Sequence, residues 1–393
     1  MSKVSEAYKR WKEHCKTVQA ATIINRKEDP GEKDKRIRRA KKDYEFFVMY
    51  YFPHYASDPC ADFQIKEANK LMRDPNFFGV WEWPREHAKS VHADVIIPMW
   101  LWITGELKGM VLVGKNETDA ANLLGDVQAE FEYNQRIIQD YGIQKKLGDW
   151  EDGEFEIADG ILFKAYGRGQ SARGIRNREK RPNYLVSDDL DDDEIVQNPK
   201  RVQKVVDWLL GSVYGAMDIR ASRFLFIGNR IHPESILAHV VGDVKPGDPK
   251  RKGLHHSKVT ATVDGSFTGE PTWHQKYTKE DLQRKFERMG FYLASREYFH
   301  RASLPGKNFK REWINWGYIP ALSKMDSIVA YFDPSYKPKT SNDYKGIKVW
   351  AKKGIKLYNI DAFCKQTTIT EAVQWLYDFH ESLPQSVIVD YYM

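Results

Sequence analysis

The hydrophobic and polar positions of this chain follow a strand–helix rhythm from about residue 76 onward. Short apolar runs of the length of buried strands alternate with longer segments that have helical periodicity. The apolar runs are 77–83, 110–113, 161–166, 184–187 and 224–227, and the helical segments are 90–103, 118–141 and 199–214. This alternation predicts an α/β domain with a mainly parallel sheet.

A second pattern of the same kind begins near residue 326. It follows a stretch at 242–275, rich in Gly, Pro, Lys and His, which predicts a loop or linker, and a helix at 278–289 with Thr278 as its expected N-cap. The predicted strands are 328–332, 346–350, 355–362 and 386–393, the last of them buried, and the predicted helix is 370–383. We therefore expect a second, separate α/β domain.

Residues 1–50 differ from both patterns because they are helix-rich and carry the whole net charge. The chain has 393 residues and a formal charge of +6, and its first 50 residues hold 14 Lys or Arg against 8 Asp or Glu. A basic arm of this kind suggests a polyanionic partner near the N-terminus, with a solvated helix as the alternative.

The composition is typical of a soluble intracellular protein of two or three domains. Hydrophobic residues make up 41% of the chain and charged residues 30%, which excludes a fibrous or disordered chain. Cys15, Cys60 and Cys364 are far apart, which argues against a disulfide framework and a cysteine zinc site. The longest apolar run, 95–103, is too short to span a bilayer, and the charged N-terminus lacks the apolar core of a signal peptide.

The first candidate for chemistry follows the predicted strand 77–83. Residues 84–90 form a short loop that ends in Lys89-Ser90 and leads into an apolar helix. In a nucleotide phosphate loop of this order, the Lys contacts the β- and γ-phosphates and the Ser hydroxyl reaches Mg²⁺. Trp83 and Ala88 stand at the two glycine positions of that motif, so an ordinary strand–loop–helix stays open. The residues expected to hold the nucleotide are Arg85, Glu86, His87, Ala88, Lys89 and Ser90.

Two carboxylates end another predicted strand, because Asp188 and Asp189 directly follow the apolar run 184–187. Asp188 is suited to bind Mg²⁺, and Asp189 to orient or deprotonate an attacking water. The four acids at 191–194 are instead expected to form a solvated turn.

Two further features fit the same site. The Gly-rich loop at 167–174 carries Arg168 and Arg173, either of which can neutralise charge on a transferring phosphoryl group; an exposed hairpin is the alternative. The strand at 224–227 ends in Gly228-Asn229, and Asn229 is the expected sensor of the γ-phosphate.

In their order and spacing these motifs resemble the large terminase subunit of tailed bacteriophages, an ATP-driven DNA-packaging motor with an attached nuclease. Residues 84–90 look like the deviant Walker A motif of that family, residues 167–190 like its Walker B region, and Gly228-Asn229 like its coupling motif. Phe63-Gln64 loosely resembles its adenine-recognition region. Family members often have Gly in place of Glu86.

Many family members also have Asp-Glu at the strand end where this chain has Asp188-Asp189. The resemblance therefore implies that the catalytic carboxylate is Asp189 or, as the weaker choice, Glu194. Arg173, or Arg168, would be the arginine finger.

The resemblance also implies a division of the chain into four parts. These are a basic helical arm at 1–55, a P-loop (ASCE-type) ATPase domain with a mainly parallel sheet at 56–245, a linker or lid at 246–325, and a partial RNase H-like nuclease domain at 326–393. Glu297-Tyr298 looks like the family's segment before the nuclease.

An RNase H-type nuclease needs carboxylates that converge on two metal ions. Asp333, at the end of strand 328–332, and Asp390, after a later helix, are the expected ligands of Mg²⁺ or Mn²⁺, with Asp343 and Asp361 as weaker candidates. The family's third carboxylate lies on a late helix, and the chain ends before it. We therefore expect this chain to hydrolyse ATP but to cleave DNA poorly.

The resemblance thus implies a viral motor subunit that uses ATP and Mg²⁺ to move double-stranded DNA into a procapsid and that cuts concatemeric DNA. The implied partners are double-stranded DNA, the portal protein, the small terminase subunit and further copies of the chain in a ring. The implied place is the host cytoplasm, away from membranes. The residues alone leave two alternatives, a cellular P-loop helicase or repair ATPase, and a nuclease or transposase-like enzyme without motor activity.

Overall fold

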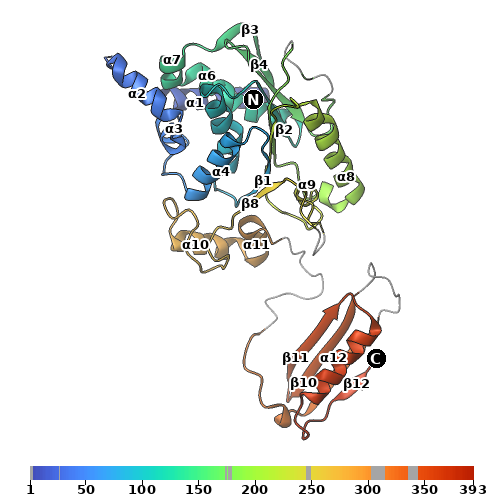
Figure 1. The fold of residues 1–393 in the computed structure, drawn as a ribbon. Helices are drawn as coiled ribbons and strands as arrows, with labels where there is room; N and C mark the ends of the chain where they lie inside the picture. Colours follow the sequence, from blue (N-terminus) through green and yellow to red (C-terminus); the bar gives the residue numbers. More distant parts are fainter. Residues whose placement is uncertain are drawn as a thin grey trace. The chain divides into compact units, whose positions relative to one another are not determined.

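The chain divides into two compact units, residues 1–305 and 306–393 (Figure 1). The structure is a computed structural model, and it describes residues 3–25, 27–172, 175, 179–244, 249–301, 315–334 and 344–393. The finer boundaries at residues 55, 245 and 325 stay predictions, because this division sets only one boundary.

The first unit is built on a mainly parallel sheet, as the strand–helix rhythm predicts. Its strand order is β3-β4-β5-β2-β6-β7-β1-β8; β4 is antiparallel to both β3 and β5, and all other neighbouring pairs are parallel. The strands are β1 (Phe78–Glu82), β2 (Gly109–Gly114), β3 (Lys145–Glu151), β4 (Glu154–Ile157), β5 (Leu162–Gly167), β6 (Tyr184–Asp188), β7 (Arg223–Gly228) and β8 (His255–Lys258).

The place of β7 in this order is informative for the site. β7 lies between β1, which leads into the loop at 84–90, and β6, which carries Asp188. An extra strand between these two is the ASCE arrangement, so the predicted fold class is confirmed. Every residue of β2, β6 and β7 is buried, as expected for central parallel strands covered on both faces.

Two hydrophobic clusters, one on each face of this sheet, form the core. Alternate strand residues face opposite sides, so Leu112 and Val186 join one cluster while Val111 and Leu185 join the other. The main helices of the first cluster are α3 (Tyr44–Tyr51), α4 (Asp62–Arg73), η1 (Val91–Ile96), α5 (Ile97–Ile103), α6 (Glu117–Tyr133) and α7 (Gln135–Tyr141). The helices of the second are α8 (Pro199–Asp207), η3 (Trp208–Val213), η4 (Tyr214–Ala216) and α9 (Ile236–Val241), with the short η2 (Ile195–Gln197).

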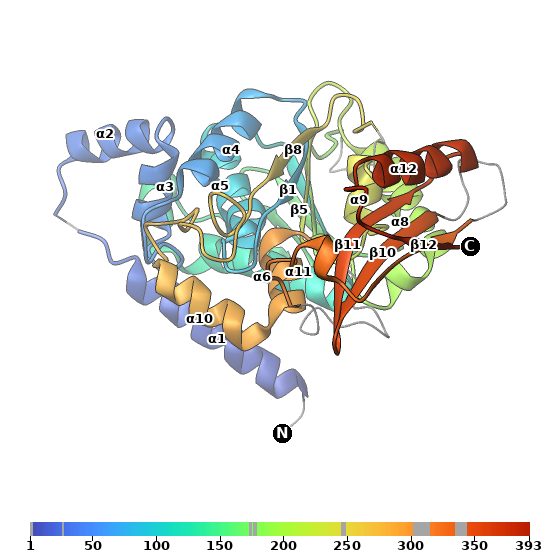
Figure 2. The same cartoon turned by 90° about the horizontal axis from the view of Figure 1, so that it is seen from below.

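The N-terminal residues form three helices that pack to different depths. These are α1 (Lys3–Ala21), α2 (Pro30–Ala40) and α3, whose Phe47 and Tyr51 are fully buried in the first cluster. α2 lies at the margin of the unit in Figure 2, where Arg36 Nη2 is 2.7 Å from Asp140 Oδ1. The basic stretch is thus attached to the first unit by an ion pair.

Local sequence signals account for most boundaries, with three differences from the predictions. The predicted helix 118–141 is two helices, because Asn134 caps the second one with its side chain. The helix predicted from residue 90 begins as a π-helix, η1 (Val91–Ile96). Strands β3, β4 and β8 were not predicted, and β8 lies within the stretch 242–275 that was expected to be a loop.

Two helices, α10 (Lys279–Met289) and α11 (Phe291–Phe299), close the first unit. Thr278 is the N-cap of α10, as predicted, and it forms a capping box with Asp281. Phe286 of α10 and Tyr298 of α11 belong to one small apolar cluster, so the two helices pack together.

The second unit is a four-stranded sheet of order β11-β10-β9-β12, with one helix packed against it. Its elements are η6 (Leu322–Lys324), β9 (Ser327–Asp333), β10 (Lys345–Lys353), β11 (Lys356–Lys365), α12 (Ile369–Glu381) and β12 (Asp390–Tyr392). β12 pairs in parallel with β9, while β9, β10 and β11 are antiparallel. The predicted buried strand 386–393 is wrong in extent, since β12 has three residues and all three are exposed.

None of the helices in the described part of the chain has the length and apolar character needed to cross a membrane.

Candidate nucleotide-binding site

The loop at 84–90 has the backbone of a tight phosphate loop although it contains no glycine. Glu86 and Ala88 adopt φ angles of 63° and 58°, a left-handed conformation that L-residues rarely take. Neighbouring side chains hold this conformation, since Gln64 Nε2 donates to the His87 carbonyl at 3.0 Å and the Tyr277 hydroxyl donates to the Glu86 carbonyl at 2.7 Å. In the described structure, Gln64 therefore contacts the loop backbone.

Residues from three neighbouring strand ends meet beside this loop. Lys89 Nζ donates to Asn229 Oδ1 at 3.1 Å, and the Ser90 hydroxyl is close enough to the Asp188 carboxylate to lower the pKa of Asp188. The sheet register explains the meeting, because Glu82 lies opposite Gly228 and Asp188 opposite Ile227, so the three strands end at one level. Ligand sites of open α/β sheets lie at such carboxyl ends.

Asp188 is a buried carboxylate in a crowded electrostatic setting. Burial, and then the charge of Asp189, raise the pKa of Asp188 to about 6, while the Ser90 hydroxyl and Lys89 lower it. Asp94 of η1 lies against Asp188 and is 1% exposed, and burial together with Asp188 raises the pKa of Asp94 well above its usual value. Sequence reasoning missed Asp94, although a lone acid in the apolar helix after Lys89-Ser90 was a visible signal.

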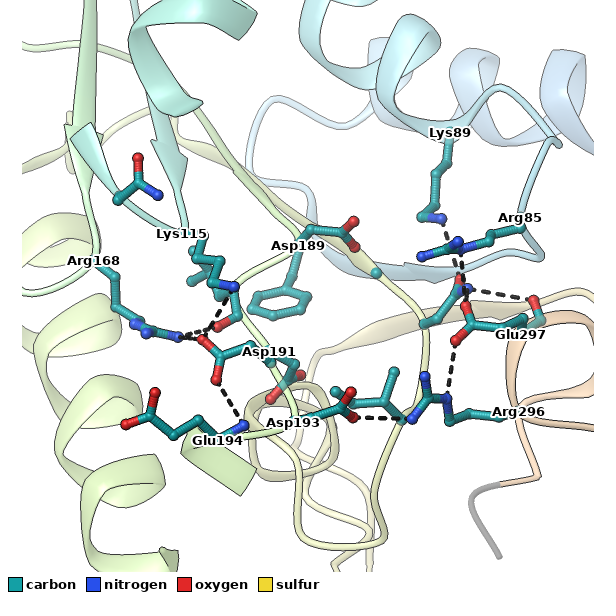
Figure 3. A pocket seen from close by; sticks show the side chains of 17 residues that line it. Arg85, Lys89, Lys115, Arg168, Asp189, Asp191, Asp193, Glu194, Arg296 and Glu297 are labelled. Atoms are coloured by element: carbon teal, nitrogen blue, oxygen red, sulfur yellow. Dashed lines mark hydrogen bonds and ion pairs between the residues drawn. The ribbon is translucent and has the colours of Figure 1, made fainter. Parts of the chain in front are cut away.

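A cavity of about 800 Å³ opens at these strand ends (Figure 3). Six of the predicted residues line it, namely Arg85, Lys89, Arg168, Asp189, Glu194 and Asn229. Glu86, His87, Ala88, Ser90 and Asp188 are not among its lining residues. Figure 3 shows Asp189 between the Lys89 side and the Arg168 side of the cavity, and Asp189 has a φ of 44°.

The His87 side chain faces away from this cavity, toward an aromatic cluster. Its Nδ1 lies 2.8 Å from the Arg85 carbonyl oxygen, and its ring centroid is 5.6 Å from that of Tyr277. Burial lowers the pKa of His87 to about 4. Any contact of His87 with a nucleotide in this cavity would therefore involve its backbone.

The acidic segment 191–194 is more ordered than the solvated turn that its composition predicts. Asp191 accepts hydrogen bonds from the backbone N–H of Ile236 at 2.6 Å and of Leu237 at 3.0 Å, which fixes the start of α9. Burial raises the pKa of Asp191 to about 6. Asp192 accepts from Arg168 Nη1 at 3.1 Å.

Of the two candidate arginine fingers, only Arg168 falls in the described structure. Arg168 Nη1 also donates to the Leu190 carbonyl at 2.7 Å, so its guanidinium is held on the acidic segment. Arg173 lies outside the described residues, and its role stays a prediction.

The far wall of the cavity comes from α11, which the sequence did not assign to the site. Glu297 Oε2 lies 3.0 Å from Arg85 Nε and 3.0 Å from Asn229 Nδ2, and Arg296 Nε donates to Glu297 Oε1 at 2.9 Å. The sequence marks Glu297 only as part of the segment that resembles the family's stretch before the nuclease, and packing brings it to the loop from about 200 residues away.

The donor set at Ser90 and Asp188 suits Mg²⁺. Both side chains offer oxygen atoms, and Mg²⁺ in nucleotide sites takes one or two carboxylates and completes its shell with waters and phosphate oxygens. Among the described residues no group of three or more His, Cys, Asp or Glu side chains is placed to hold a metal by itself.

The second predicted site is not assembled in the same way. Asp390 lies opposite Val329 in the parallel pair of β12 and β9, four residues from Asp333. At about 3.3 Å per residue this offset is about 13 Å along the strands. The structure therefore does not bring Asp333 and Asp390 together, and both side chains are exposed. Asp343 lies outside the described residues.

Comparison with known proteins gives likenesses in solved structures alone. No family model matches the chain, and no curated protein matches it. The large terminase from the thermophilic bacteriophage D6E is 14% identical with a TM-score of 0.42, over 84% of this chain and 77% of that chain. The large terminase of bacteriophage HK97 is 13% identical with a TM-score of 0.39, over 97% and 74%. The large terminase ATPase domain of Thermus phage P74-26 is 14% identical with a TM-score of 0.39, over 59% and 91%.

Proposed function

We propose that the first unit is an ATPase that binds ATP in the cavity between the loop at 84–90 and α11, with Mg²⁺ held next to this cavity by Ser90 and Asp188. The observation that carries this proposal is the convergence of Lys89, Asn229, Ser90 and Asp188 at the ends of β1, β7 and β6. An ammonium, an amide and a metal-binding oxygen pair at one sheet edge form a suitable set for a triphosphate.

Each of these residues has a defined task in the proposed reaction. Lys89 binds the β- and γ-phosphate oxygens as a point charge, and Asn229 contacts the γ-phosphate. Ser90 and Asp188 hold Mg²⁺, which neutralises charge on the phosphates when it is bound. Asp189 lines the cavity and orients or deprotonates the attacking water.

The proposed work of this ATPase is the packaging of double-stranded DNA into a viral procapsid. The resemblance of the phosphate loop, the acidic strand end and Gly228-Asn229 to terminase motifs supports this use. The proposed partners are double-stranded DNA, the portal protein, the small terminase subunit and further copies of the chain in a ring. The exposed basic residues of α2 offer phosphate contacts that are independent of DNA sequence and weaken with salt.

We further propose that the second unit is part of an RNase H-like, metal-dependent nuclease. Its sheet, with three antiparallel strands and a fourth strand parallel to the first, supports this proposal, as does Asp333 at the end of the first strand. Because Asp390 is offset from Asp333, we expect this chain to cut DNA poorly with Mg²⁺ or Mn²⁺.

The test is a steady-state phosphate-release assay with and without double-stranded DNA. Lys89→Ala should lower ATP hydrolysis at least about 100-fold, since one lost electrostatic contact to a transferring group has that weight. The matched control is Lys66→Ala, which removes an exposed lysine of α4 and should leave the rate unchanged. An ATPase rate indifferent to Lys89→Ala would refute the nucleotide site. ATP hydrolysis without stimulation by DNA would refute the motor assignment.

A further inference from the structure

The end of α11 is tied directly to the groups that are proposed to bind phosphate. The Glu297 carboxylate bridges Arg85 Nε and Asn229 Nδ2, each at 3.0 Å from its Oε2 atom (Figure 3). Asn229 in turn accepts from Lys89 Nζ at 3.1 Å, so one continuous hydrogen-bonded chain joins Lys89 to Glu297. Glu297 is 5% exposed, which makes its carboxylate a buried anion at this position.

Backbone contacts fix Glu297 in this place. The Arg85 N–H donates to the Glu297 carbonyl at 3.1 Å, and Asn229 Nδ2 lies 3.3 Å from the same oxygen. The loop at 84–90 and the end of β7 are therefore attached to α11 through both the side chain and the backbone of one residue.

α10 makes two further contacts with the same loop. Lys285 Nζ lies 3.0 Å from Glu86 Oε1, and the Tyr277 hydroxyl, just before α10, donates to the Glu86 carbonyl. Phe286, Tyr298 and Phe299 pack α10 and α11 into one cluster, so a displacement of Glu297 would be transmitted to both helices.

We propose that the Glu297 carboxylate competes with the nucleotide's terminal phosphate for Arg85 and Asn229, and that its contacts hold α11, and α10 with it, against the phosphate loop. This inference rests on the proposed ATP site. A carboxylate and a phosphate are both oxygen anions that pair with guanidinium and amide donors, so they compete for Arg85 and Asn229. ATP binding must then displace the Glu297 carboxylate, which removes the side-chain part of the attachment between α11 and the loop.

The competition has a direct consequence for affinity. Part of the binding free energy of the nucleotide is spent on displacing Glu297, so removing its charge should tighten nucleotide binding. Arg85 is 63% exposed, and solvent screening limits the contribution of its ion pair. We therefore expect an effect of about tenfold on the dissociation constant.

The experiment is calorimetric titration of the full chain with Mg²⁺–ATPγS, for the native sequence and for Glu297→Gln. Gln keeps the shape of the side chain and removes its charge, and we expect a dissociation constant about tenfold lower. Glu297→Asp is the second variant, because its shorter carboxylate cannot span Arg85 and Asn229 and should also tighten binding. Glu287→Gln makes the same charge change at an exposed position of α10 and should bind like the native chain.

Hydrogen exchange supplies a readout apart from affinity. In the native chain, amides of residues 291–299 should lose protection when Mg²⁺–ATPγS is added, whereas in Glu297→Gln they should already be less protected without nucleotide. If both Glu297 variants bind as the native chain does or more weakly, and exchange in α11 ignores nucleotide, the inference is overturned while the ATP site stands. If the native chain does not bind Mg²⁺–ATPγS, both the site and the inference fail.

Discussion

Both sheets of this protein carry charged or polar residues at the ends of parallel neighbouring strands. In the first sheet these residues lie close together, and in the second they do not. In the first unit, β1, β7 and β6 are parallel neighbours in registers that bring their last residues to one level, so Lys89, Asn229 and Asp188 meet just past them. In the second unit β9 and β12 are also parallel neighbours, but Asp390 opens its strand while Asp333 ends its own. Strand order decides which strands are neighbours, and the register between two neighbouring strands decides whether their end residues lie at the same level.

The largest effect is expected when one carboxylate is removed from the proposed ATPase site of the first unit. Asp189→Asn should lower the turnover number for ATP hydrolysis about 1000-fold, because the amide cannot accept a proton from the attacking water. Nucleotide affinity should change far less than the rate, since Asp189 is proposed to act on the attacking water, whereas Lys89 and Asn229 are proposed to bind the phosphates. The measurement is a single-turnover assay combined with Mg²⁺–ATPγS titration, and an unchanged turnover number would contradict the role of Asp189.

The two units should also differ in how their histidines affect stability as the pH changes, because His300 of the first unit is buried. Burial lowers the pKa of His300 to about 4, so between pH 6.5 and pH 4 the unfolded chain binds a proton that the folded chain does not. Stability from this residue is therefore present above pH 6.5 and is lost as the pH falls, by about 2 kcal/mol between pH 7 and pH 5.

Urea unfolding at pH 7 and pH 5, followed by tryptophan fluorescence, measures this effect. His300→Gln should lose about 2 kcal/mol less than the native chain over this interval. His380→Gln, at an exposed position of the second unit, serves as the control and should lose as much as the native chain. An equal loss in all three proteins would show that His300 does not stay neutral in the folded state.

The phosphate loop itself allows a smaller test. Ala88 has a φ of 58°, and glycine reaches this conformation without the steric cost of about 1 kcal/mol that an L-residue meets. Ala88→Gly should therefore raise the thermal midpoint by about 2 °C. Ala120→Gly, inside the regular helix α6, should lower it by a similar amount. If both variants lower the thermal midpoint equally, the left-handed conformation of Ala88 carries no steric cost that glycine relieves.

The smallest change in activity is expected for substitutions of Asp333 and Asp390, the two carboxylates of the second unit that do not lie close together. Asp333→Ala and Asp390→Ala should leave ATP hydrolysis unchanged, and neither should alter the weak cutting of plasmid DNA expected with Mn²⁺. Strong metal-dependent cutting that either substitution abolishes would mean that the two carboxylates do converge, and it would contradict the register of β9 and β12.

The parts of the fold that sequence predicted are those with strong local signals. The five apolar runs became β1, β2, β5, β6 and β7 because central parallel strands must be apolar on both faces. β8 escaped prediction because His255-His256-Ser257-Lys258 is polar. It forms a strand because its histidines meet buried acids, with His256 Nε2 2.8 Å from Glu82 Oε2. Although burial opposes it, that hydrogen bond and the neighbouring cations hold the pKa of Glu82 below its usual range.

The residues of the candidate site that sequence predicted are also those with a local signal. Lys89, Asp188 and Asn229 each follow an apolar strand, which is a signal within a few residues. Glu297 carries no such signal, since it reaches the loop only through the packing of α10 and α11 on the first unit. The offset of Asp390 was equally invisible, because a strand's register depends on its partner and not on its own sequence.

The most direct test of the central claim is an experimental structure of the full chain with Mg²⁺–ATPγS. We predict the terminal phosphates at Lys89 and Asn229, the metal at Ser90 and Asp188, and Asp189 facing the γ-phosphate. A nucleotide bound elsewhere, or a metal that does not contact Ser90 or Asp188, would contradict the assignment of this strand-end cavity as the ATPase site.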